Sequence, residues 1–206
     1  RISSIEPNLL TAEIISFVRQ SKKFVPHFHI PLQSGNNKIL KAMRRRYLRE
    51  LYSERIKWIK SEIPHCCIGV DVIVGFPGET ESDFLDTYQF INELDISYLH
   101  VFTYSERPNT PAIEMEDVVP MEVRRDRNEM LRILSLKKKK AFTEQYLGTT
   151  RKVLIEQSQD SETMHGFTDN YIKISLPKDE SLINQIVNVR LKQWDETCDA
   201  VVAELV

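Results

Sequence analysis

Short apolar runs alternate with segments of helical periodicity over the first half of the chain. We predict strands at residues 1–5, 27–33, 68–74 and 98–104. Apolar residues that recur every three or four positions predict helices at 11–20, 36–45, 49–61 and from residue 80 onward. This alternation is typical of right-handed βα units around a parallel sheet. The sheet is either open and doubly wound or extended by strands upstream of Arg1, and its bare first edge favours the second arrangement.

The second half has a different pattern. From Pro120 a helical pattern runs to about Tyr146, and Gly148 suits the end of that helix. Runs of strand character without intervening helices then follow at 151–156, 171–176, 186–194 and 199–206. Such a series is typical of a small antiparallel barrel or sandwich. We therefore divide the chain into a βα domain at 1–120, a connecting helix at 121–147 and a small β domain at 148–206.

Composition narrows the class of protein. The 206 residues are 41% apolar, which is enough to bury a core. The sequence has no apolar run near the roughly 20 residues that span a bilayer, and no signal-peptide pattern. The cysteines Cys66, Cys67 and Cys198 do not form a disulfide framework, and the adjacent pair suggests ordinary burial. We expect a cytoplasmic protein without a membrane partner.

Charge is distributed unevenly along the chain. Residues 74–120 carry ten acidic side chains and one basic one, whereas residues 121–152 carry ten basic and four acidic ones. The basic segment, including the run at residues 137–140, either forms an RNA-facing surface or is a solvated helix of mixed charge.

Groups able to bind a ligand follow each of the predicted strands. They are Ser4 and Glu6; Gln33, Ser34 and Gly35; Gly75, Pro77, Gly78 and Glu79; and Tyr104, Ser105 and Arg107. Ligands gather at the carboxyl ends of parallel strands, so these groups predict one common site.

The stretch "DVIVGFPGET" is the most specific of these strand ends. Gly75 removes a side chain where the strand ends, so that a flat ring can lie against the backbone. Pro77 and Gly78 shape a turn, and Thr80 caps the next helix. A plain strand-to-helix turn, with Glu79 near the helix dipole, is the alternative.

The other strand ends offer complementary chemistry. Glu6 can bind an amino group, Gln33 and Ser34 can bind the hydroxyls of a ribose, and an arginine of "MRRRY" can bind a carboxylate. Together these groups suit an amino-acid nucleoside, although each could instead face solvent or satisfy loop backbone. His27 and His29 share one face of a strand and lack nearby metal ligands in the sequence, so we expect them to pack or to support the site.

These segments carry a family resemblance. "RISSIEP", "HFHIPLQSGNNKILKAMRRRY", "DVIVGFPGET" and "YSERPNTPA" resemble the second half of the radical S-adenosylmethionine domain of methylthiotransferases. "LGTTRKVLIE" and "GFTDNYIKI" resemble the small RNA-binding TRAM domain of those enzymes. The resemblance implies an α/β fold with the last four βα units of a partial (β/α)6 TIM-like barrel, followed by a small antiparallel β-barrel.

The resemblance also implies an activity. "SSIEP" with "HIPLQSG" is most similar to the branch that adds a methylthio group to C2 of N6-threonylcarbamoyladenosine at position 37 of tRNA. The branches that act on isopentenyladenosine or on a ribosomal protein have somewhat different sequence motifs at these strands. Such enzymes use S-adenosylmethionine and two [4Fe–4S] clusters, and their partner here would be tRNA; the sequence does not identify the sulfur donor. A non-catalytic RNA-binding module is the alternative from another class.

By resemblance, site residues can be assigned to the cofactor. Glu6 would meet the amine of S-adenosylmethionine, Gln33 and Ser34 its ribose, and Arg45 its carboxylate. The adenine would be flanked by Val74, Gly75, Phe76, Pro77 and Gly78, with Phe102 closing the pocket. The cysteines that hold the family's clusters are absent from these residues and are expected upstream of Arg1, so we expect this chain alone to be inactive.

The small domain offers RNA-binding groups by the same resemblance. Phe167 and Tyr171 can stack on bases, and Arg151, Lys152 and Lys173 can meet phosphates. Packing in the barrel core for the aromatic residues, and a solvated surface for the basic ones, are the alternatives.

Overall fold

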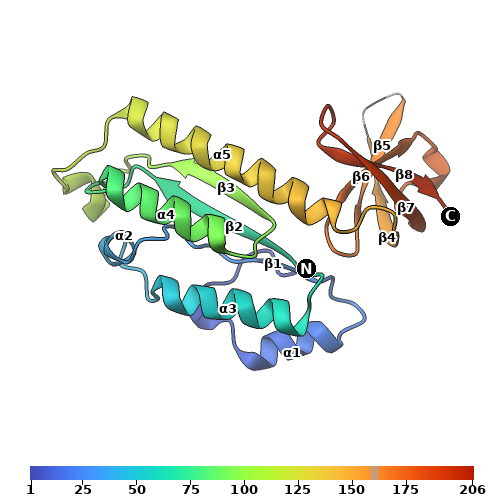
Figure 1. Cartoon of the computed structure of the whole chain (residues 1–206), viewed down its shortest axis with the longest axis horizontal. Coiled ribbons are helices and arrows are strands. Elements are labelled where there is room, and N and C mark those ends of the chain that lie inside the picture. The colour runs from blue at the N-terminus through green and yellow to red at the C-terminus, as the bar shows by residue number, and fades with distance from the viewer. Residues whose placement is uncertain (159, 161) are drawn as a thin grey trace.

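The computed structural model describes residues 1–158, 160 and 162–206 (Figure 1). The first half contains α1 (Ala12–Gln20), β1 (His27–His29), α2 (Asn37–Ala42), α3 (Arg49–Glu62), β2 (Cys67–Val74), α4 (Glu81–Glu93), β3 (Tyr98–Thr103) and α5 (Met121–Glu144). The second half contains β4 (Thr150–Glu156), β5 (Thr163–Thr168), β6 (Lys173–Pro177), β7 (Ile186–Asp195) and β8 (Ala200–Leu205). Within the described residues, no helix has the length and apolar character needed to cross a membrane.

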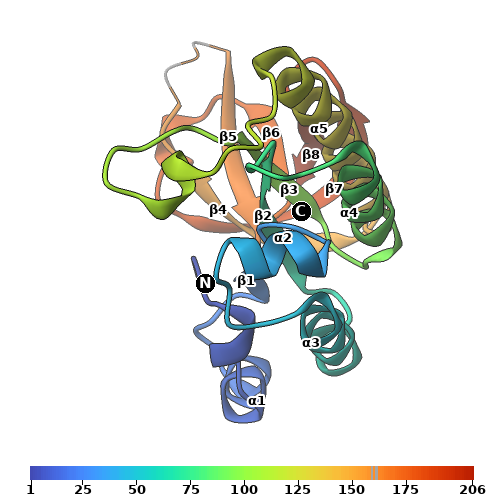
Figure 2. The same cartoon turned by 90° about the vertical axis from the view of Figure 1, so that its left-hand side faces the viewer.

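A parallel sheet of the order β1-β2-β3 forms the centre of the first half. Alternate residues of β2 point to opposite faces, and Val70, Val72 and Val74 are fully buried on the face that helices cover. Figure 2 shows α3, α4 and α5 along that side of the sheet. The opposite face, here called the open face, carries Asp71 and Ile73, which are only partly buried.

The first predicted strand is shorter than expected. Residues 1–5 form a single parallel bridge between Ile2 and Phe28 rather than a fourth strand, although Ile5 also donates its N–H to the carbonyl of His29 at 3.0 Å. The sheet therefore has three strands and not four. Pairing does not extend further because Pro7 starts a 3₁₀ turn directly after this segment.

The free edge of β3 is covered by side chains of α5. Ser135 accepts a hydrogen bond from the N–H of Leu99 at 2.8 Å and donates one to its carbonyl at 3.0 Å. Asn128 donates to the carbonyl of Val101 at 3.1 Å. The long predicted helix is thus confirmed, and it occupies the position that a further strand would otherwise take.

The second half is a closed barrel of the order β4-β5-β6-β8-β7. Its pairing is antiparallel except between β6 and β8, which run parallel, so the predicted antiparallel barrel is correct only in part. The sequence pattern also missed β5. The inward positions of this strand are Met164, Gly166 and Thr168, and a Cβ at Gly166 would lie 2.5 Å from the carbonyl oxygen of Leu154.

Several contacts join the barrel to the sheet. Phe142, near the end of α5, packs with Cys67 of β2 and the barrel core. Lys140 forms an ion pair with Glu196 at 3.0 Å, and Lys139 forms one with Asp199. Lys138 donates to the carbonyl of Leu94 at 2.7 Å. Three of the four lysines of the run thus bond to other elements of this chain, and an RNA-facing surface here stays a prediction.

Candidate functional site

A cavity of about 870 Å³ lies on the open face at the carboxyl ends of the strands. Of the residues that the sequence predicts for the cofactor, Gln33, Arg45, Phe76 and Phe102 line it. Asp71, Ile73, Tyr104, Ser105 and Arg107 also line it. We call it the strand-end cavity. Its lining mixes aromatic rings with an amide, a carboxylate and guanidinium groups, which suits a ligand that has both a ring and charged ends.

Arg45 and Glu6 meet beside this cavity. An Nη1–H of Arg45 donates to Oε1 of Glu6 at 3.3 Å, and both side chains remain partly exposed. The Nε of Arg45 is buried and has no hydrogen-bond partner within the described part of the chain. The structure thus brings together the two residues predicted for the opposite charges of an amino acid.

Gln33 and Ser34 have different surroundings. Gln33 adopts a φ of 69°, and its backbone bonds to Asp71 and Ile73 of β2, so its side chain is placed at the cavity by the sheet. Ser34 is fully buried, and its hydroxyl lies 3.2 Å from the hydroxyl of Thr87. It also accepts the N–H of Asn36 at 3.2 Å. For Ser34 the structure shows the alternative role, which is to satisfy the loop.

Gly75 makes room for an arginine of this chain. Its φ is 74°, and a Cβ built there would lie 2.3 Å from Cγ of Arg124. Arg124 thus fills the space on the Cβ side of Gly75, and the expected contact of this backbone with a flat ring stays a prediction. Gly78 has a φ of 81° with nothing within 4 Å of a built Cβ. Val74 and Pro77 are buried and do not line the cavity.

Glu79 fixes the turn from within. Its Oε2 accepts the N–H of Gly75 at 2.6 Å and a hydrogen bond from Arg127 at 2.8 Å. The carboxylate is almost completely buried, and this burial raises its pKa, while the bonds to Gly75 and Arg127 act in the opposite direction. Thr80 then starts α4 with the predicted capping box, completed by Asp83. Glu79 thus holds the turn in place, which is more than the helix-dipole role expected for it.

Arg124 and Arg127 are the important residues that the sequence prediction missed. Arg124 donates to the carbonyls of Val119 and Tyr104, each at 2.8 Å, and to Glu106 at 2.6 Å. Both arginines are buried, on the face of α5 that Leu131 and Leu134 also use. Their spacing from these leucines is the signal that could have identified them.

The histidines of β1 pack and support the open face, as predicted. Nε2 of His27 lies 3.0 Å from the hydroxyl of Tyr98. Burial, helped by the charges of Arg1 and His29, lowers the pKa of His27 to about 4. His29 lies 2.8 Å from Asp71. Throughout the described ranges, no group of three His, Cys, Asp or Glu side chains is placed to hold a metal ion.

Two of the three cysteines are buried. Cys66 and Cys67 are buried at the start of β2, and burial raises the pKa of the Cys67 thiol to about 12. It also raises the pKa of Cys66. Cys198 lies in the barrel half of the chain. Within the described residues, the three cysteines do not join other side chains in a group of three that could hold a metal ion.

The aromatic residues predicted to bind RNA stack on each other. The rings of Phe167 and Tyr171 are 4.6 Å apart at an angle of 17°. The guanidinium of Arg1 lies 4.6 Å from the ring of Tyr171, and the ring of His27 lies 4.3 Å from it. Tyr171 is therefore largely engaged within the chain, whereas Phe167 keeps the freer ring.

The predicted basic residues of the barrel are only partly free. Arg151 forms an ion pair with Asp169 at 3.3 Å and lies over the ring of Tyr146. Lys173 donates to the carbonyl of Cys198 at 3.3 Å. Lys152 is exposed.

Two family descriptions match this chain. Residues 2–91 match the Radical SAM superfamily. Residues 144–196 match the TRAM domain. Together the two matches cover two of the three strands of the sheet, β1 and β2, with the helices around them, and most of the barrel.

Several curated proteins are similar over nearly the whole chain. The threonylcarbamoyladenosine tRNA methylthiotransferase MtaB of Bacillus subtilis is 42% identical over 195 residues, which are 93% of this chain and 43% of that protein. The tRNA-2-methylthio-N(6)-dimethylallyladenosine synthase of Pelotomaculum thermopropionicum is 37% identical over 191 residues, with 92% and 43% covered. The chain thus spans less than half the length of these relatives.

A solved structure shares the fold. The coproporphyrinogen III oxidase HemN of Escherichia coli, described as a radical SAM enzyme, aligns with a TM-score of 0.51 over 97% of this chain and 50% of that one. The sequence identity is 15%, so this likeness shows the fold alone.

Proposed function

Because the chain belongs to the radical S-adenosylmethionine methylthiotransferase family, we propose that it is part of an enzyme that adds a methylthio group to C2 of N6-threonylcarbamoyladenosine in tRNA. The similarity to MtaB, at 42% identity over almost the whole chain, is the observation that carries the proposal. The strand-end cavity supports it, since ligands of parallel βα folds bind at this end of the sheet.

The residues at the strand-end cavity suit S-adenosylmethionine. Its ammonium would bind Glu6 and its carboxylate Arg45, whose buried Nε is without a partner in the described residues. The amide of Gln33 would meet the ribose, and the rings of Phe76 and Phe102 would enclose the adenine. When bound, S-adenosylmethionine supplies the radical chemistry that the reaction requires. Ser34 would reach the ribose only by exchanging its bond to Thr87.

Among the described residues, no three candidate ligands gather where they could hold a metal ion. We propose that the two clusters of the family depend on cysteines outside this chain and that the chain alone is inactive. Reconstitution of the purified chain with iron and sulfide tests this idea. We expect no stoichiometric [4Fe–4S] absorption, and a stoichiometric signal would contradict the proposal.

The substrate can be tested on cellular tRNA. Mass spectrometry of nucleosides from a strain that lacks the whole gene should show loss of the methylthio group from N6-threonylcarbamoyladenosine, with recovery on complementation. Loss of the methylthio group from the isopentenyl nucleoside would instead assign the protein to the dimethylallyladenosine branch. Unchanged tRNA nucleosides would refute both assignments.

A further inference from the structure

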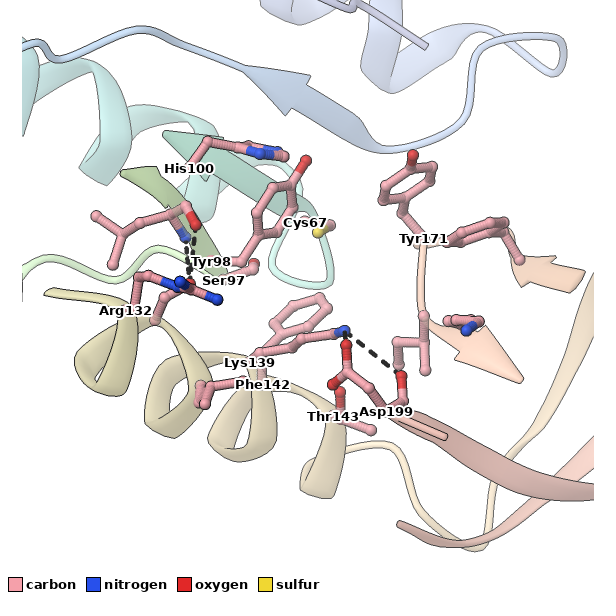
Figure 3. Close-up of a pocket in the computed structure, with 16 residues that line it drawn as sticks. Cys67, Ser97, Tyr98, His100, Arg132, Lys139, Phe142, Thr143, Tyr171 and Asp199 are labelled. Atoms are coloured by element: carbon pink, nitrogen blue, oxygen red, sulfur yellow. Dashed lines mark hydrogen bonds and ion pairs between the residues drawn. The ribbon is translucent and has the colours of Figure 1, made fainter. Parts of the chain in front are cut away.

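A second cavity, of about 410 Å³, lies at the seam between the sheet, α5 and the barrel (Figure 3). We call it the seam cavity. Cys67 and Tyr98, which line it, are the first residues of β2 and β3, so it lies at the amino ends of the strands. The two cavities share no lining residue, although His100 lines the seam cavity and Phe102, two residues further along β3, lines the strand-end cavity. The two cavities are therefore separate sites.

Aromatic rings from three parts of the fold line the seam cavity. Tyr98 comes from β3, Phe142 from α5, and Phe167 and Tyr171 from the barrel. Tyr98 and Tyr171 have their positions fixed by His27, which bonds to the first at 3.0 Å and packs 4.3 Å from the second. Phe167 is stacked on Tyr171 and only partly buried. The ring that remains free to stack on a flat ligand is therefore that of Phe167.

Positive charge surrounds these rings. Arg132, Lys139 and Lys173 all line the seam cavity, against one acidic residue, Asp199. Figure 3 shows Lys139 reaching from α5 to Asp199, and the opposite charges of these two side chains neutralise each other. Arg132 is exposed and makes no hydrogen bond or ion pair with any residue that the structure describes. An anion at the seam cavity would therefore meet a free guanidinium.

We propose that the seam cavity binds one nucleotide of a single-stranded segment of RNA, with its base on Phe167 and its phosphate on Arg132. The chemistry favours this occupant, because aromatic platforms beside cationic side chains are the usual means of holding single-stranded nucleic acid. The inference rests on the proposed tRNA substrate. It adds a contact outside the strand-end cavity and uses α5 as well as the barrel.

Binding by the 206-residue chain tests the proposal without any cluster or cofactor. A fluorescent single-stranded oligoribonucleotide and an unmodified tRNA are titrated by anisotropy. Phe167→Leu should weaken binding about tenfold, since it removes a stacking platform. Phe167→Tyr retains the ring and should bind like the wild type. Arg132→Ala should weaken binding about fivefold and reduce the salt slope by about 1.

Lys137→Ala is the matched control for charge, because Lys137 lies on α5 and does not line the seam cavity. It should change affinity less than Arg132→Ala, and all variants should unfold at the wild-type temperature. Photo-crosslinking of 4-thiouridine RNA should label peptides that contain Phe167 or Tyr98.

The two proposals fail in distinguishable ways. Wild-type affinity in both Phe167→Leu and Arg132→Ala would overturn the nucleotide site while leaving the methylthio nucleoside assay unaffected. Crosslinks confined to Lys152 would place the RNA elsewhere on the barrel and would also overturn it.

Discussion

The guanidinium of Arg45 donates to the carboxylate of Glu6 at 3.3 Å beside the strand-end cavity. An amino acid carries both opposite charges on one carbon, so it can replace this pair by binding each partner separately. The ammonium of the ligand then takes the place of Arg45 at Glu6, and its carboxylate takes the place of Glu6 at Arg45. Each protein charge keeps a partner throughout, which limits the cost of desolvation on binding.

Arg45→Ala should weaken binding of S-adenosylmethionine to the chain by about tenfold or more, since a charge-assisted bond to the carboxylate is lost. Isothermal titration measures the change. Arg46→Ala is the control, because Arg46 is exposed and does not line the cavity. The free energy of unfolding should change by less than about 1 kcal/mol, as for other partly exposed ion pairs. Equal affinities for the two variants would refute the assignment.

Gly75→Ala should destabilise the chain by about 3 kcal/mol. The substitution combines a positive φ, which is unfavourable for alanine, with a Cβ only 2.3 Å from Cγ of Arg124. Gly78→Ala has the same backbone strain and open space around the Cβ, so it should cost only about 1 kcal/mol. Denaturant unfolding followed by circular dichroism compares the two. Similar losses of unfolding free energy in both variants would show that the Arg124 side chain can move aside at little cost.

Arg127→Met should cost about 3 to 5 kcal/mol, because it leaves the Glu79 carboxylate buried without its cationic partner. Glu79→Gln in the same background should restore much of the loss, since an amide oxygen can still accept the N–H of Gly75. A double-mutant cycle measures the coupling. Additive effects of the two substitutions would contradict a direct interaction.

The loss of stability in Arg127→Met should depend on pH, and the direction of this dependence follows from the pKa of Glu79. Burial already raises the pKa of Glu79, and removal of Arg127 raises it further. A carboxyl whose folded pKa exceeds its unfolded value favours folding at low pH, and this stability is lost as pH rises through the folded pKa. Arg127→Met should therefore lose more stability relative to the wild type at pH 8 than at pH 5.

The sequence predicted the elements of the sheet well and the contacts of the site less well. Apolar runs and helical periodicity identify βα units because burial of those residues is local to each element. The roles of Arg124 and Arg127 were not predicted, because a charged residue is normally expected on the surface. In the structure each guanidinium instead donates to carbonyl and carboxylate groups of other segments. β5 was not predicted because its inward positions include Gly166, a residue type depleted in strands, and Thr168, which is polar and so breaks the apolar alternation.

Long-range packing also determines which aromatic rings are available to stack on a base. Composition cannot distinguish a tyrosine whose ring is free to stack on a base from one whose ring is already stacked within the chain. Tyr171 is of the second kind, since Phe167, His27 and Arg1 surround its ring. Two of these contacts, with His27 and Arg1, join residues more than a hundred positions apart, and a local sequence pattern does not reveal them.

His27 should make the chain sensitive to mild acid. Its pKa is about 4 in the folded state because it is buried beside Arg1 and His29, against 6.5 as the ordinary value. The unfolded chain therefore binds an additional proton between these values, and stability falls as pH decreases through that window. The contribution of His27 should amount to about 2 kcal/mol between pH 7 and pH 5.

Denaturant unfolding of the wild type and of His27→Gln at both pH values isolates this contribution, because other groups titrate equally in the two proteins. Glutamine can still hydrogen-bond to Tyr98 but does not gain a charge. His27→Gln should be less stable than the wild type at pH 7, and the difference should shrink or reverse at pH 5. Parallel losses in the two proteins would mean that His27 stays neutral or finds an acceptor on protonation.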